Sequence, residues 1–173
     1  GILRVVALMG DKRASVAVDA YRELLSGAEK EFGFDHENVL AARSNLAAAL
    51  SRDNRWGEAV AEYRMLVQGY EWVLGPDHPG TLATRGNLAG ALRESGRVEE
   101  AIEAYQTVLT DYLRVLGADH PGTLATRGNL AGALQDAGRV EEAIEAYQTV
   151  LTDRLRVLGP DHPSTLKTRD NLV

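Results

Sequence analysis

The sequence predicts an all-α fold built from stacked pairs of antiparallel helices. The first observation is an internal repeat, because residues 74–115 and 116–157 are identical at 37 of 42 positions. The second is that apolar residues recur at spacings of three and four within each copy, as on one face of a helix. The third is that no stretch alternates polar and apolar residues, so we expect no strands.

The period of 42 residues divides the whole chain. The full copies are 32–73, 74–115 and 116–157. Residues 1–31 read as a partial copy, and residues 158–173 as a copy that breaks off, as in an excised fragment. A repeat that cannot bury its apolar face alone stacks on its neighbours. We therefore expect residues 1–173 to form a single array.

The first helix of each copy is expected to run from about Gly80 to Ser95 in the copy 74–115. Asp77 or His78 is suited to cap it, and Pro79 fits its first turn. Gly96 is placed to end it, and the same place holds Asn54 one copy earlier and Gly138 one copy later. The apolar side is carried by Leu82, Leu88, Ala89, Ala91 and Leu92.

The second helix is expected over about five turns, with an amphipathic pattern. Its apolar residues are Val98, Ala101, Ile102, Tyr105, Val108, Leu109, Tyr112, Leu113 and Leu116. Its outer side is acidic, with Glu99, Glu100 and Glu103, which we interpret as a solvated face. The sequence Gly117-Ala118-Asp119-His120-Pro121 then turns the chain into the next copy.

Composition and motifs exclude several classes of function. The chain has no cysteine, so it has no disulfide and no thiol nucleophile. A net charge of −6 argues against a nucleic-acid-binding surface. No apolar run reaches the length of about 18 residues that a membrane span needs. We therefore expect a cytoplasmic protein without a membrane segment.

Catalysis finds no support in the sequence. The four histidines occur once per copy at the same corner, which separates them by about 10 Å, too far apart to share a metal ion. They are His36, His78, His120 and His162. No phosphate-binding glycine-rich loop, nucleophile elbow or HExxH motif occurs. We expect no enzyme activity, no cofactor and no metal site.

A family resemblance rests on Gly96, Ala101 and Tyr105 together with the stretch Asn87-Leu88-Ala89. These residues resemble the tetratricopeptide repeat, and the 42-residue period with LGxDHPxTL is similar to its longer kinesin-light-chain and nephrocystin type. Similar arrays are attached to bacterial signalling ATPases of the NB-ARC class. The resemblance implies a right-handed superhelix with the first helices on its concave face and the second helices on its convex face. It also implies that a partner binds in the concave groove.

Small residues and an asparagine share one stripe of the first helix, opposite Leu88 and Leu92. The candidate groove residues are Asn45, Asn87, Asn129, Asn171, Ala83, Gly86, Gly90, Ala125, Gly128 and Gly132. In one interpretation the glycines let neighbouring helices approach closely. In the other they form a smooth floor on which a ligand lies close to one asparagine amide per copy, which can donate to and accept from a peptide backbone.

An arginine stands in each copy where the ordinary motif has a bulky aromatic residue. These residues are Arg43, Arg85, Arg127 and Arg169. Because an unpaired buried charge is costly, one interpretation is that the guanidinium reaches a carboxylate, carbonyl or tyrosine hydroxyl of a neighbouring helix. In the alternative interpretation the guanidinium lies at the groove edge and binds an acidic partner.

Three functions follow from these observations. The first is a protein-interaction module that binds a protein or peptide, including an acidic one. The second is a regulatory array on a larger signalling ATPase. The third is a self-assembling structural array, because apolar residues are left uncapped at both ends. Those residues are Ile2, Leu3, Val6, Leu8, Leu166, Leu172 and Val173.

Overall fold

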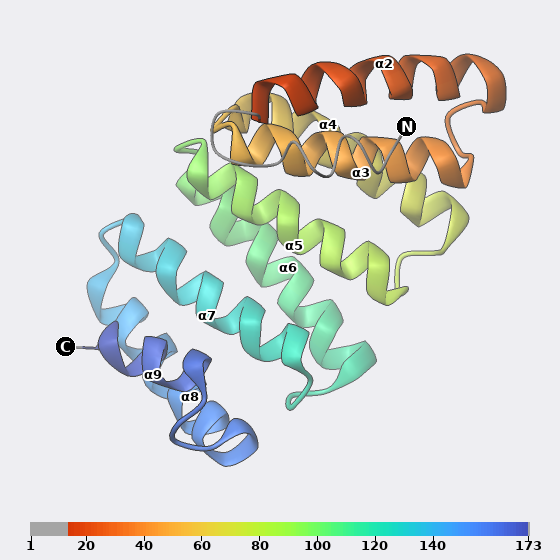
Figure 1. Cartoon of the computed structure of the whole chain (residues 1–173). Coiled ribbons are helices and arrows are strands. Elements are labelled where there is room, and N and C mark those ends of the chain that lie inside the picture. Colours follow the sequence, from red (N-terminus) through yellow and green to blue (C-terminus); the bar gives the residue numbers. More distant parts are fainter. Residues whose placement is uncertain (1–13, 173) are drawn as a thin grey trace. The chain divides into compact units, whose positions relative to one another are not determined.

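The computed structural model describes residues 14–172, and this part of the chain is helical without strands, as expected (Figure 1). The candidate end residues Ile2, Leu3, Val6, Leu8 and Val173 lie outside the described residues. The helices are α2 (Ala14–Phe32), α3 (Glu37–Arg52), α4 (Trp56–Val73), α5 (Pro79–Glu94), α6 (Val98–Leu116), α7 (Pro121–Asp136), α8 (Val140–Leu158) and α9 (Pro163–Asp170).

The helices fall into two compact units, of which unit 1 ends at Ser95 and unit 2 begins at Gly96. In unit 1, α2 packs on α3, α3 on α4 and α4 on α5. In unit 2, α6 packs on α7, α7 on α8 and α8 on α9. Within each unit, each helix therefore packs on the next along the chain, and short turns join the helices (Figure 1).

Every first helix begins at a histidine. The imidazole Nδ1 of His36, His78, His120 and His162 accepts a hydrogen bond from the backbone N–H two residues further on, at 3.0–3.2 Å. A proline follows three of these histidines in the first turn of α5, α7 and α9. The sequence allowed either the aspartate or the histidine as the cap, and it is the histidine that satisfies the free amide.

The first helices end where the sequence indicated. Asn54, Gly96 and Gly138 have φ values of 56°, 82° and 73°, in the left-handed region that glycine and asparagine tolerate best. Within the two units, Asn54 and Gly138 reverse the chain, so that α4 packs back on α3 and α8 packs back on α7.

The core consists of the apolar stripes that the repeat predicts. In unit 2, for example, Ile102, Tyr105 and Val108 of α6 and Leu124 of α7 are buried. Buried threonines were not expected. The hydroxyls of Thr81 and Thr123 donate to the carbonyls of Gly75 and Gly117 at 2.8 and 2.7 Å, and they fix each first helix to the turn before it.

Candidate binding surface on the first helices

The asparagine of each first helix is available for a ligand. Asn87, Asn129 and Asn171 are exposed, and Asn45 is half-buried. None of the four side-chain amides makes a hydrogen bond or ion pair within residues 14–172. Asn171 lies at the C-terminal cap of the short helix α9. The repeat thus presents amides without protein partners at one position per copy, with two of them in each unit.

Unit 1 also has a pocket beside one of these amides. The pocket has a volume of about 290 Å³ and lies between α2 and α3. Asn38 and Asn45 contribute polar groups to its lining. The small side chains of Ala41 and Ala42 leave room for the pocket on the side formed by α3. A side chain of a ligand that hydrogen-bonds to Asn45 could enter this pocket.

The glycines of the stripe have unequal surroundings. A Cβ atom added to Gly86 would meet no atom within 4 Å, so the surface there is open. Gly90 is half-buried, whereas the equivalent Gly132 is buried. The alanines next to the asparagines, Ala83 and Ala125, are exposed. The open floor expected of a ligand surface therefore exists around Gly86.

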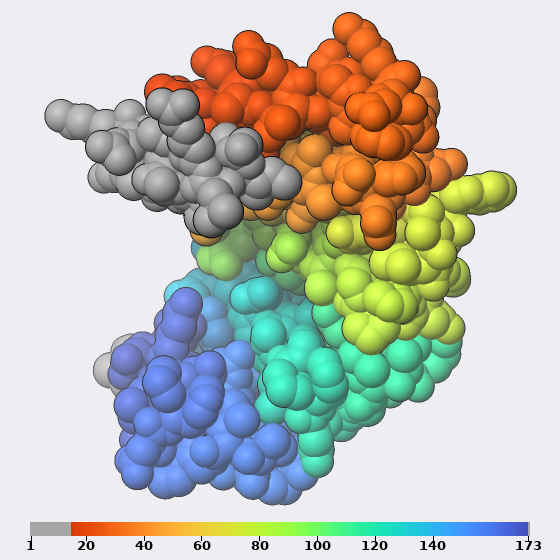
Figure 2. Space-filling model, turned by 45° about the vertical axis from the view of Figure 1, so that its right-hand side comes forward, coloured from red at the N-terminus to blue at the C-terminus, as the bar shows by residue number. Residues whose placement is uncertain are grey.

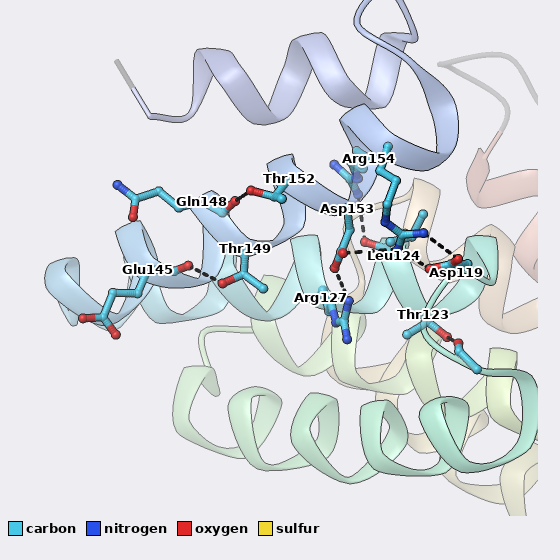
Figure 3. A network of polar contacts seen from close by, with 12 residues as sticks. Asp119, Thr123, Leu124, Arg127, Glu145, Gln148, Thr149, Thr152, Asp153 and Arg154 are labelled. Carbon is cyan, nitrogen blue, oxygen red and sulfur yellow. Dashed lines mark hydrogen bonds and ion pairs between the residues drawn. The ribbon is translucent and has the colours of Figure 1, made fainter.

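Gly128 is different because an arginine side chain lies against it. A Cβ atom at Gly128 would lie 2.8 Å from Nη2 of Arg154. The same Nη2 donates to the backbone oxygen of Leu124 at 3.0 Å (Figure 3). Nη1 donates to the backbone oxygen of Ser164 at 3.0 Å and to Oγ1 of Thr168. At this position the missing side chain serves packing, since it lets the guanidinium reach the backbone of α7.

Arg154 was missed as a structural residue by the sequence analysis. Burial lowers the pKa of its guanidinium, and its Nε is buried without a hydrogen-bond partner in the described part of the chain. The equivalent residue one copy earlier is Tyr112, which is one of only five differences between the two copies. That difference was the one available signal in the sequence.

The repeated arginines form ion pairs. Arg43 is 4% exposed and donates to Glu29 of α2 and, at 2.6 Å, to Glu62 of α4. Arg85 donates to Glu71 at 2.7 Å, and Arg127 donates to Asp153 (Figure 3). Arg169 is exposed. The first three arginines thus reach carboxylates of neighbouring helices, and a place for Arg169 at a groove edge stays a prediction.

The outer face carries charge pairs of its own. The arginine that precedes each second helix makes two hydrogen bonds with the glutamate three residues later, as Arg97 does with Glu100 at 2.6 Å. Arg139 forms the equivalent pair with Glu142 one copy later, and its hydrogen bond lowers the pKa of the Glu142 carboxyl group. No group of three or more metal-ligating side chains occurs within the described range, and no described helix is long and apolar enough to cross a membrane.

Known proteins share this pattern. Family models of the tetratricopeptide repeat match residues 39–80, 63–112, 83–152 and 123–173. No curated protein matches the chain. Two crystal structures of a Podosopora anserina protein, described as a kinesin light chain with nearly identical TPR-like repeats, are similar at 29% and 30% identity. Their TM-scores are 0.81 and 0.79, and each match covers 93% of this chain and 76% of the other. BtubC (BKLC) from P. vanneervenii shares the fold, with a TM-score of 0.67 at 20% identity over 94% of this chain and 62% of the other.

Proposed function

Because the chain belongs to the tetratricopeptide repeat family, whose members generally bind protein partners, we propose that it holds an extended peptide segment along its first helices. The observation that carries this proposal is the series of side-chain amides without protein partners, one per copy. An amide both donates to and accepts from a peptide backbone, so it binds a chain without requiring a particular sequence.

The arrangement of the amides suits an extended ligand. Within each unit, the two first helices pack on the same second helix, α3 and α5 on α4 and α7 and α9 on α8, so an extended chain could be held by one amide of each. Within unit 1 the pair is Asn45 and Asn87, and within unit 2 it is Asn129 and Asn171. The open surface at Gly86 and the pocket beside Asn45 favour contact with ligand side chains in unit 1.

The test compares variants for capture of partners from an extract of the native cells, with the full chain as bait. Asn87→Ala with Asn129→Ala should weaken binding by about 1 kcal/mol per lost hydrogen bond and leave the melting temperature nearly unchanged. The matched control replaces two exposed amides of the second helices, as Gln106→Ala with Gln148→Ala, and should bind like the parent. Gly86→Leu should block binding by filling the open floor.

Two results would contradict binding along the first helices. A double asparagine variant of unchanged stability that captures its partner as well as the parent would place the interaction elsewhere. Equal losses in the asparagine and glutamine variants would also contradict a role specific to the first helices.

Self-assembly is the second candidate, because one observation favours it. Ile102 and Leu124 are each 2% exposed, whereas the equivalent residues one copy later, Ile144 and Leu166, are 43% and 42% exposed. Helices α8 and α9 thus expose to solvent two side chains whose equivalents one copy earlier are buried. A regulatory role in an NB-ARC-type ATPase stays a hypothesis from the sequence resemblance.

A further inference from the structure

The α2–α3 turn and the C-terminal end of α4 carry two very exposed aromatic side chains. Trp72 is 78% exposed and Phe34 is 65% exposed, the highest values for large hydrophobic side chains among the described residues. Both belong to unit 1, and the two segments lie on the same edge of that unit (Figure 1). In the space-filling view, atoms of the α2–α3 segment lie beside those of the end of α4 (Figure 2). Exposed aromatic residues grouped in this way indicate a contact surface.

The equivalent corner of unit 2 is closed by an ion pair. Arg156 of α8 holds Asp119 of the preceding turn through both guanidinium nitrogens, one of them at 2.7 Å, and this contact lowers the pKa of Asp119. By the 42-residue period, Trp72 corresponds to Arg156 and Asp35 corresponds to Asp119. Since α3 packs on α4 as α7 packs on α8, the repeat puts Asp35 and Trp72 at the positions that Asp119 and Arg156 occupy in unit 2.

Unit 1 therefore has the carboxylate of Asp35 at the position of Asp119, but it has the indole of Trp72 at the position of the arginine that pairs with Asp119. Asp35 is exposed and forms no ion pair within residues 14–172. Its neighbours add to the contrast with unit 2, because Glu37 and Phe34 stand where unit 2 has Pro121 and Ala118.

The charge of this corner is negative. The exposed carboxylates of Glu31, Asp35 and Glu37 are close in the chain, and the basic side chain in the same stretch is Lys30 in the last turn of α2. The turn itself is ordered by the ring of Phe32, which stacks on His36 with the ring centroids 4.5 Å apart. Unit 1 thus offers aromatic surface and carboxylates where unit 2 holds a bound guanidinium.

We propose that this corner binds an arginine side chain from a basic segment of a protein partner. The guanidinium pairs with Asp35 in the two-pronged manner that Arg156 shows on Asp119, and the indole of Trp72 covers its face through a cation–π contact. Planar guanidinium fits this arrangement better than a lysine ammonium, because it can pair with a carboxylate and stack at the same time. The surface is separate from the amides of the first helices.

The probe is a fluorescent peptide of four Arg-Gly repeats, titrated with the full chain and followed by anisotropy. The matched peptide has citrulline in place of arginine, which keeps the shape of the side chain and removes its charge. We expect the arginine peptide to bind, the citrulline peptide not to bind, and the binding to weaken as salt is added.

Two variants and one control locate the site. Trp72→Arg supplies an internal guanidinium to Asp35 and removes the indole, and Asp35→Asn removes the carboxylate, so each should weaken peptide binding by about tenfold. The control is Asp161→Asn, which alters the exposed aspartate at the same place in the α8–α9 turn and should change nothing. Circular dichroism and thermal melting verify that each variant is folded.

Two results would overturn the proposal. The first is parental affinity for the peptide in folded Trp72→Arg; if that variant also loses self-association, the surface contacts a second copy of the chain. The second is a loss in Asp161→Asn equal to that in Asp35→Asn.

Discussion

A single difference between two nearly identical copies decides the role of a neighbouring glycine. Arg154 extends from α8 to the backbone oxygen of Leu124, and its guanidinium occupies the space beside Gly128. Gly86, at the same place one copy earlier, faces open space. Close packing therefore accounts for Gly128, whereas Gly86 leaves the open surface that the proposed ligand floor needs.

The residue-scale prediction compares Gly86→Ala with Gly128→Ala. Gly86→Ala should raise the free energy of unfolding by up to about 1 kcal/mol, because alanine is the better helix former and its Cβ meets nothing. Gly128→Ala should raise the free energy of unfolding by about 1 kcal/mol less than Gly86→Ala does, because Arg154 must move and loses its hydrogen bond to Leu124. Urea unfolding measures both values.

The Arg154→Ala background is the control for this comparison. Without the arginine side chain, the two alanine substitutions should stabilise the protein equally. Equal effects in the parent would show that Arg154 moves aside without cost, and the packing role of Gly128 would then be wrong.

The sequence predicted the stripe on which the glycines lie, because counting 100° per residue places every side chain around a single helix. It did not predict the neighbour of Gly128, because Arg154 comes from another helix and reaches Gly128 only through a particular rotamer. The ion pairs show the same limit. That these arginines would form ion pairs followed from the cost of burying a charge. The identity of each partner did not follow, because Arg85 pairs with Glu71 whereas Arg127 pairs with Asp153. The residue equivalent to Glu71 in the next copy is Leu113, which cannot form an ion pair.

At the scale of elements, the packing of a second helix on the next first helix depends on two facing residues whose side chains must have complementary sizes. A Cβ atom at Gly122 would lie 2.8 Å from the ring of Tyr112, and burial raises the pKa of that tyrosine. One copy later the corresponding residues are Arg154 and Ser164, and the arginine donates to the serine backbone. The two pairs are alternative solutions for the same junction of helices.

The element-scale prediction exchanges one pair for the other. Gly122→Ser alone should cost about 1–3 kcal/mol of unfolding free energy, because the rigid ring of Tyr112 leaves no room for the new side chain. The Cβ contact with His120 does not decide the cost, since Ser164 accommodates the equivalent His162. Adding Tyr112→Arg should recover most of the loss, so a double-mutant cycle measures a favourable coupling between the two changes.

Strictly additive effects of the two substitutions would contradict this junction rule. The helix boundaries themselves were predictable, since a histidine marks the start of each first helix and a glycine or asparagine marks its end in the full copies, and both act locally. The match between Tyr112 and Gly122 was not predictable, because it depends on how closely α6 and α7 approach each other, and this distance is set by the whole interface.

At the scale of the whole molecule, the repeat leaves a surface that the next copy would cover. Ile144 of α8 and Leu166 of α9 are exposed, although Ile102 and Leu124 are buried at the equivalent places one copy earlier. Apolar surface that is covered inside a stack but exposed here favours association between molecules. Each Å² of apolar surface that the association buries stabilises the complex by about 25 cal/mol.

The last prediction follows from this surface. The parent chain should associate as its concentration rises, and Ile144→Lys with Leu166→Lys should shift it towards the monomer, because two charges cannot be buried without partners. Sedimentation velocity over a range of concentrations measures the shift. The control is Leu113→Lys, which adds charge at an exposed apolar residue of α6 and should leave the association unchanged. A parent chain that stays monomeric at high concentration, or an equal effect of Leu113→Lys, would exclude the end of the last copy as the contact, because only residues that are buried in the preceding copy carry this argument.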